Sequence, residues 1–164
     1  MIKDKRVRKV RIVDQRKRYF ANFDALLDTS NHGTLWLKNP QVAELVASAI
    51  HHRDRKQYNL FAYCVMPNHV HLVFSLDAVA QRGSSPYNLT DILENLKWYT
   101  AKEANKILRR KGSFWLHESY DHVVRSASEL RRAVAYLLNN PVKAGFANSW
   151  EEWKWTYIRR DLDI

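Results

Sequence analysis

Residues 64–74 decide the fold, and they read Cys64-Val65-Met66-Pro67-Asn68-His69-Val70-His71-Leu72-Val73-Phe74. Side chains alternate between the two faces of a strand, so His69 and His71 are predicted to share one face. Pro67 and Asn68 form a turn signal just before them. The apolar run at 59–65 predicts a partner strand on the other side of that turn. The sequence therefore predicts a strand pair with two imidazoles at its mouth.

The two histidines are a candidate metal site. Side chains two residues apart on a strand are about 7 Å apart, which allows both imidazoles to lean onto one divalent ion. The alternative is that His69 and His71 are ordinary half-buried histidines on an edge strand. The turn signal favours a site, because binding residues are concentrated where strands meet loops.

Composition limits the class of protein. A chain of 164 residues is most simply one domain, and a hydrophobic fraction of 46% argues against general disorder. No apolar stretch is long enough for a membrane span, and the charged N-terminus does not resemble a secretory signal. The single cysteine, Cys64, excludes an internal disulfide and a multi-cysteine metal site. We expect a cytoplasmic, nucleoid-associated protein with no membrane partner.

The charge predicts a polyanionic partner. The net charge is +10 and the isoelectric point is about 9.8, and basic side chains that neutralise phosphates supply affinity for nucleic acid. Residues 3–18 hold nine Lys or Arg against two Asp, within a helix predicted to reach about residue 27. That segment is either a solvated face or an arm that follows phosphates. Its candidate DNA-binding residues are Lys9, Arg11, Arg16, Lys17 and Arg18.

Helix signals follow in two places after the turn at 28–33. Asn39 and Pro40 begin a helix that should end near Arg53. After a connector at 80–86, Asn88, Thr90 or Asp91 can cap a helix that reaches about Arg110. Basic side chains occupy its outer faces, and the candidate DNA-binding residues among them are Lys97, Lys102, Lys106, Arg109 and Arg110.

The C-terminal third predicts two short strands and one helix. The strands are expected at 113–116 and 121–125. Ser126 or Ser128 caps a helix at 128–140, which should end at Asn139-Asn140-Pro141 because proline disfavours helical geometry in the residue before it. The aromatic tail, with Trp150, Trp153, Trp155 and Tyr157, is expected to close over the core, and base stacking is the less favoured alternative.

The helix at 128–140 carries a second candidate pair. Tyr136 and Asn140 are four residues apart and therefore share a helical face, where a phenol and a carboxamide could serve as nucleophile and oxygen ligand. On composition alone Tyr99 or Tyr120 would serve equally. Two other chemistries are rejected: His117 and His122 are five apart, not four as in zinc proteases, and four glycines leave little room for a phosphate-binding loop.

Taken together, these motifs resemble the single-tyrosine HUH transposases, and most closely the REP-associated tyrosine transposase (IS200-like) branch. The resemblance covers about residues 35–157. The matching motifs, in order, are Val65-Met66-Pro67-Asn68-His69-Val70-His71-Leu72-Val73, Gly112-Ser113-Phe114-Trp115, Glu118-Ser119-Tyr120-Asp121-His122, Tyr136-Leu137-Leu138-Asn139-Asn140-Pro141-Val142-Lys143-Ala144-Gly145 and Trp153-Lys154-Trp155.

The resemblance implies a ferredoxin-like α+β fold with a central antiparallel sheet. It also implies an endonuclease and strand transferase of single-stranded or hairpin DNA, as a monomer or a homodimer. Tyr136 matches the nucleophile that forms a 5′-phosphotyrosine bond, and His69, His71 and Asn140 match the metal ligands. Mg²⁺ or Mn²⁺ is expected, and a mixed nitrogen and oxygen set fits Mn²⁺ better.

The N-terminus departs from this family pattern. No counterpart of the apolar first strand precedes the basic segment, so that strand is expected to be missing or diverged and the family-like core to begin near residue 35. Within a single domain spanning 1–164, residues 1–34 are then a poorly matched basic segment. The alternative function is a catalytically inactive, domesticated or truncated relative that binds hairpin DNA without cutting it.

Overall fold

The computed structural model describes residues 34–76, 88–117, 119 and 121–162. The predicted helix before residue 27, the turn at 28–33, the connector at 80–86, Tyr120 and the basic residues from Lys9 to Arg18 lie outside them. The single-domain assignment therefore stays a prediction.

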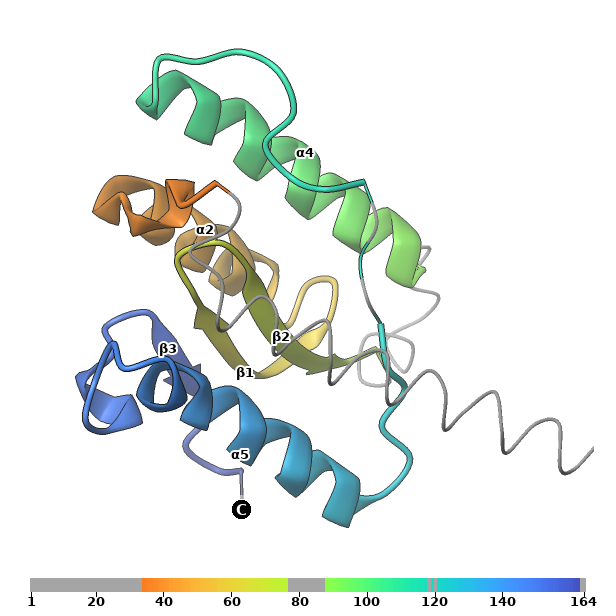
Figure 1. Ribbon diagram of the computed structural model, residues 1–164. Helices are drawn as coiled ribbons and strands as arrows, with labels where there is room; N and C mark the ends of the chain where they lie inside the picture. Colours follow the sequence, from red (N-terminus) through yellow and green to blue (C-terminus); the bar gives the residue numbers. More distant parts are fainter. Residues whose placement is uncertain (1–33, 77–87, 118, 120, 163–164) are drawn as a thin grey trace, which may run out of the picture. The chain divides into compact units, whose positions relative to one another are not determined.

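The described residues form an α+β unit, which confirms the predicted fold class (Figure 1). In chain order its elements are η1 (Trp36–Lys38), α2 (Pro40–Arg53), β1 (Asn59–Val65), β2 (Val70–Ser75), α4 (Leu89–Ile107), α5 (Ala127–Lys143), η2 (Trp150–Glu152) and β3 (Thr156–Ile158).

The sheet has three antiparallel strands in the order β2-β1-β3. The predicted strand pair is thus confirmed, and the C-terminal strand lies on the far side of β1. Cys64 of β1 is the register partner of His71 on one side and of Thr156 on the other. A bulge between Leu60 and Ala62 shifts the register once. Among the described residues, the sheet has no strand from before β1.

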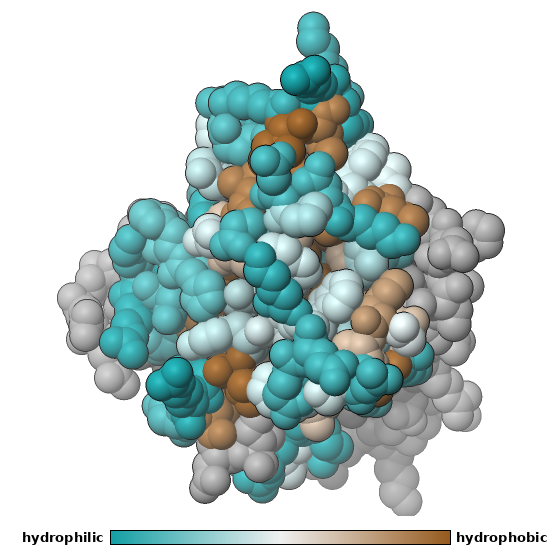
Figure 2. Space-filling model, turned by 90° about the vertical axis from the view of Figure 1, so that its left-hand side faces the viewer, coloured by the Kyte–Doolittle hydropathy of each residue, from teal (hydrophilic) through white to brown (hydrophobic). Residues whose placement is uncertain are grey.

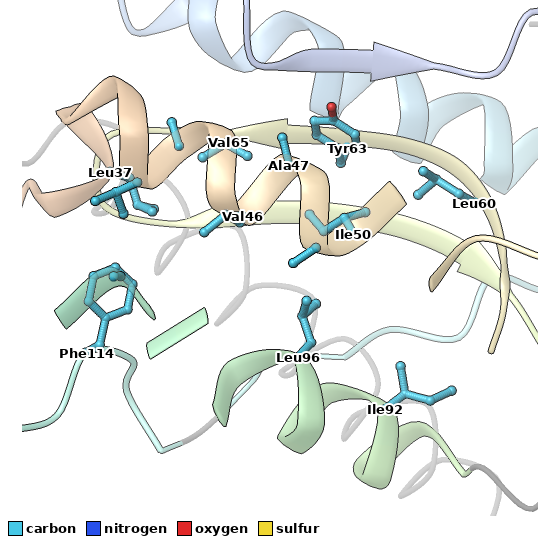
Figure 3. Close-up of a cluster of buried hydrophobic side chains, with 14 of the residues drawn as sticks. Leu37, Val46, Ala47, Ile50, Leu60, Tyr63, Val65, Ile92, Leu96 and Phe114 are labelled. Atoms are coloured by element: carbon cyan, nitrogen blue, oxygen red, sulfur yellow. The ribbon is translucent and has the colours of Figure 1, made fainter. Parts of the chain in front are cut away.

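Helices cover both faces of this sheet. On one face, α2 packs on β1 and α4 packs on α2; Figure 3 shows their side chains meeting in one apolar cluster. On the other face, α5 packs on β1 and β2 (Figure 1). Alternation along β1 divides the two cores, because Tyr63 and Val65 belong to the first cluster whereas Cys64 and Met66 belong to the α5 cluster. Cys64 is fully buried, as expected of a packing residue.

The helix starts agree with the sequence. The Asn39 side chain accepts hydrogen bonds from the backbone N–H groups of Gln41 and Val42, and Pro40 is the first residue of α2. Asn88 caps α4 and Ser126 caps α5, each by accepting a backbone N–H three residues on.

Three predicted features of the C-terminal half are wrong. No strand forms at 113–116 or within the described part of 121–125; Phe114 instead packs into the first cluster, and Trp115 donates to Thr100 Oγ1 at 2.8 Å. Helix α5 continues past Asn140 and through Pro141 to Lys143. Proline lacks only one backbone N–H, and the last turn keeps the bond from Ala144 N to Asn140 O at 2.9 Å.

Three of the four predicted aromatic residues of the tail pack against the core. Trp155 and Tyr157 pack against the first cluster and Trp153 against the α5 cluster. Trp153 Nε1 also donates to Val65 O at 3.0 Å, and Val65 N donates to Trp155 O at 3.0 Å. The tail thereby fastens the end of β1 next to the histidine turn.

Two surface findings complete the fold. Hydrophilic side chains predominate on the face drawn in Figure 2, where hydrophobic ones form separate patches. Among the described residues, every helix is too short or too polar to cross a membrane.

Candidate functional site

The turn between β1 and β2 positions the histidines. Met66 N donates to His69 O at 2.9 Å, which closes the turn, and Leu37 N donates to Pro67 O at 3.1 Å, which ties the turn to η1. Residue 69 directly precedes β2, whereas residue 71 is its second residue. The turn is thus held from both sides, and its histidines are fixed by backbone contacts.

The two imidazoles converge, as the sequence predicted. The Nε2 atoms of His69 and His71 are 2.9 Å apart, and their rings meet edge to face with centroids at 4.6 Å. His69 Nδ1–H donates to Asn68 Oδ1 at 2.7 Å. With its proton on Nδ1, His69 presents Nε2 as a lone pair, which is the tautomer of a metal ligand.

His71 is half-buried on the α5 side of the sheet. Burial disfavours its charged form and lowers the pKa of His71 from 6.5 to about 4. His71 is therefore neutral near pH 7, as metal binding requires.

Tyr136 lies beside this pair. Its ring meets the His71 ring edge-on, with centroids 6.0 Å apart and planes at 90°. The side chain is 37% exposed, so a substrate can reach it. Tyr99 is also exposed, but on α4, where its ring contacts Arg53. Of these two tyrosines, the contact geometry favours Tyr136 as the partner of the histidines.

Asn140, the predicted third ligand, is an unusual residue of α5. It is fully buried, and neither atom of its side-chain amide has a hydrogen-bond partner among the described residues. An unsatisfied buried amide costs about 1–3 kcal/mol. It lies one turn beyond Tyr136 on the helix that packs against β2. An amide oxygen that binds a metal ion would be left buried and without a hydrogen-bond donor when the ion is absent, and the Asn140 oxygen has these properties.

These donors fit a divalent ion. Two ligand atoms about 2.1 Å from one ion and at right angles are about 3 Å apart, and the two Nε2 atoms are 2.9 Å apart. Within the described part of the chain, no group of three or more His, Cys, Asp or Glu could hold a metal. If the third ligand comes from these described residues, it is of another type, as the Asn140 amide is.

Helix α4 ends at Ile107 and not near Arg110 as predicted. The predicted DNA-binding residues on α4 and just after it have mixed surroundings. Lys97 donates to the carbonyls of Leu116 and His117, and burial lowers its pKa. Lys106 pairs with Glu103 at 2.8 Å. Arg110 lies 3.7 Å from the Trp36 ring centroid and donates to Asn105 and Ser113. Lys102 and Arg109 are exposed, and the Lys102 ammonium is 5.1 Å from the Trp98 ring centroid.

Two residues of the site were not predicted. The sequence pattern assigned Asn68 only to a turn. A side-chain acceptor next to a candidate ligand histidine could also have indicated that Asn68 orients that histidine. The Lys143 ammonium lies 5.8 Å from the Tyr136 ring centroid. Its spacing of seven residues, two helical turns, was visible in the sequence, but the helix was expected to end before it.

Comparison with known proteins places the chain. A family described as "Transposase IS200 like" matches residues 35–140. The chain belongs to this IS200-like transposase family. The match begins one residue before η1 and ends at Asn140, so it includes both histidines and Tyr136.

Two curated relatives agree with the REP-associated branch. A Haemophilus influenzae protein provisionally named a REP-associated tyrosine transposase is 26% identical over 110 residues, which are 64% of this chain and 61% of the relative. The REP-associated tyrosine transposase of Escherichia coli is 24% identical over 110 residues, 67% of this chain and 59% of the relative. The chain thus spans about three fifths of the length of these relatives. No solved structure matches it significantly.

Proposed function

We propose that this IS200-like transposase cleaves and rejoins single-stranded DNA through Tyr136. The observation that carries the proposal is the edge-to-face contact between the rings of Tyr136 and His71. The Nε2 atom of His71 is in turn 2.9 Å from the Nε2 atom of His69. Two relatives are named REP-associated tyrosine transposases, and we extend the proposal to hairpin-forming DNA on the strength of the family resemblance. The net charge of +10 suits a polyanionic substrate.

Tyr136 acts as the nucleophile in this proposal. Its phenolic oxygen attacks a backbone phosphorus, the bond from phosphorus to the 3′ oxygen breaks, and a 5′-phosphotyrosine bond forms. The phenolic proton ends on the released 3′-hydroxyl. In strand transfer a 3′-hydroxyl attacks the phosphotyrosine and restores the phenol, so the linkage conserves the energy of the phosphodiester.

His69, His71 and Asn140 would hold the divalent ion, Mg²⁺ or Mn²⁺. When bound, such an ion supplies Lewis-acid polarisation of a non-bridging phosphate oxygen. The chain's own contribution is to keep His69 in the ligand tautomer, through its hydrogen bond to Asn68, and to keep His71 neutral near pH 7, through desolvation.

A covalent-adduct assay tests this function. The protein is incubated with Mn²⁺ and a set of labelled single-stranded oligonucleotides that form hairpins, and a denaturing gel separates any protein–DNA adduct. We expect an adduct with the wild-type chain and none with Tyr136→Phe. The matched control is Tyr99→Phe, which removes an exposed phenol from α4 and should keep the adduct. An adduct that persists in Tyr136→Phe would sink the assignment.

One observation keeps a second function in view. Among the described residues the sheet has three strands and none from before β1, so a hairpin-binding relative that does not cut remains the alternative. Measurable DNA affinity with no adduct across several metals and repeat substrates would favour that alternative. Any Tyr136-dependent adduct would remove it.

A further inference from the structure

We propose that the backbone of the single-stranded DNA follows the stripe of α5 that carries Tyr136, with Arg132 and Lys143 as the phosphate-binding residues on either side of the nucleophile. The inference rests on the proposed function, which it deepens by naming the surface that receives the substrate. We call Arg132, Tyr136 and Lys143 the nucleophile stripe.

Helical geometry places these three side chains in line. At 100° per residue, Arg132 and Lys143 point within about 40° of Tyr136 around the helix axis. At 1.5 Å per residue, Arg132 lies about 6 Å before Tyr136 along the axis and Lys143 about 10 Å after it. Both basic side chains are exposed. Two positive charges therefore bracket the nucleophile on its own face of the helix.

The contact of Lys143 with Tyr136 fixes the direction of one charge. The ammonium lies 5.8 Å from the centre of the phenol ring, so it is held on the nucleophile's side and not swung to the opposite flank. A phosphate that approaches the phenol thereby meets a cation. The buried residues of α5 are Val134, Leu137, Asn140 and Pro141, whereas Arg132 and Lys143 are exposed. The stripe therefore borders the core at Asn140 and carries its two charges in solvent.

The acid on this side of α5 is already engaged. Glu129 points within about 20° of Tyr136 around the axis, but its carboxylate accepts from Arg125 N at 3.0 Å and from His122 Nε2 at 2.9 Å. It thus completes the cap at the helix start. The nucleophile stripe therefore has two positive charges beside this one negative charge.

Helix α4 offers less positive potential than its sequence indicates. Lys97 donates to two backbone carbonyls, and Lys106 is paired with Glu103. Within α4 itself the number of lysines, three, equals the number of acidic residues, which are Asp91, Glu94 and Glu103. The nucleophile stripe, unlike α4, leads directly to the reacting group. We therefore place the DNA backbone there.

The helix supplies a matched control for a charge test. Arg131 is an exposed neighbour of Arg132 on the same helix, but it points about 140° away from Tyr136. We would compare Arg132→Gln, Lys143→Gln and Arg131→Gln, each of which removes one charge from an exposed site. Thermal unfolding followed by circular dichroism would verify that all three variants are folded.

Salt-dependent binding gives the first readout. Affinity for a fluorescein-labelled single-stranded oligonucleotide of mixed sequence is measured between about 50 and 200 mM KCl. Each stripe variant should reduce the steepness of log K against log salt by about 0.7, the value of one phosphate contact. Arg131→Gln should reduce it distinctly less. Equal reductions in all three variants, or none in the stripe variants, would overturn the proposal.

Adduct formation gives the second readout and separates the two hypotheses. If the wild-type chain forms an adduct, Arg132→Gln and Lys143→Gln should slow it more than Arg131→Gln does, and the opposite ranking contradicts the stripe. If the wild-type chain forms none, the proposed function fails, but the salt slopes still decide whether DNA lies on the nucleophile stripe.

Discussion

His71 and Tyr136 meet edge to face although they come from different elements, with ring centroids 6.0 Å apart and planes at 90°. The contact depends on the α5 cluster, where Leu137, the residue after Tyr136, packs with Cys64, the register partner of His71. The nucleophile is therefore placed by the same apolar contacts that hold α5 on the sheet.

Asn68→Ala should weaken metal binding. The substitution removes the acceptor of the His69 Nδ1 proton, 2.7 Å away, so His69 loses the partner that keeps Nε2 available. Loss of such an outer partner typically costs 10- to 100-fold in metal affinity, and we expect about that decrease for Mn²⁺, measured by calorimetric titration.

Asn68→Asp supplies the matched control, because it retains an acceptor at the same position. Its Mn²⁺ affinity should stay near that of the wild-type chain. Wild-type affinity in Asn68→Ala would show that the hydrogen bond does not position His69.

Acid should destabilise the metal-free protein through His71. Burial lowers the pKa of His71 from 6.5 to about 4, so the unfolded chain takes up this proton at a higher pH than the folded one. The contribution of neutral His71 to the free energy of unfolding is therefore fully present above pH 6.5 and is lost as the pH falls toward 4. Between pH 7 and pH 5 we expect a loss of about 2 kcal/mol in the free energy of unfolding.

Urea denaturation with a chelator present measures this effect, and His71→Gln isolates it. The variant lacks the titrating ring, so its stability should fall by about 2 kcal/mol less over the same pH interval. Parallel pH profiles for the two proteins would contradict the prediction.

The local parts of this fold could be predicted from the sequence. The strand pair followed from alternation around Pro67 and Asn68, and the three helix starts from Asn39, Asn88 and Ser126. These features depend on side chains a few residues apart, so short-range patterns determine them. The convergence of the two imidazoles followed from the same alternation.

The errors came from contacts between distant residues. Phe114 and Trp115 have strand-like alternation, but they bury themselves against η1 and α4, where Phe114 stacks on Trp36 and Trp115 donates to Thr100. Pro141 was expected to end α5, but packing against the sheet outweighs one missing hydrogen bond. The spacing of residues in the sequence does not reveal that the buried Asn140 amide lacks a hydrogen-bond partner among the described residues, nor which carbonyls Lys97 contacts.

Arg110→Lys should destabilise the protein and leave its DNA affinity nearly unchanged. The Arg110 guanidinium lies over the Trp36 ring at 3.7 Å and donates to Ser113 O at 2.9 Å. Lysine keeps the charge but lacks the planar group that stacks and donates in two directions. We expect a loss of about 1 kcal/mol in the free energy of unfolding, measured in urea.

Arg109→Lys is the control, because Arg109 is the exposed neighbour. It should unfold like the wild-type chain. If Arg110→Lys kept wild-type stability and instead lost DNA affinity, Arg110 would be a DNA contact, as the sequence alone predicted.

Asn140→Leu should separate stability from metal binding. Leucine has a similar volume and removes a fully buried amide that has no hydrogen-bond partner among the described residues. In a chelator the variant should therefore be as stable as the wild-type chain or more stable, by up to about 1–3 kcal/mol. Added Mn²⁺ should stabilise the wild-type chain, by about 2.7 kcal/mol at 100 times Kd, and the variant much less.

Asn139→Leu tests whether the position of the amide matters, because Asn139 is the exposed neighbour on the same helix. It should keep the full Mn²⁺ stabilisation. Equal stabilisation of Asn140→Leu and Asn139→Leu by Mn²⁺ would remove Asn140 from the ligand set. A large loss of stability for Asn140→Leu in chelator would instead show that the amide has a structural partner, since only a satisfied group is costly to replace with an apolar one.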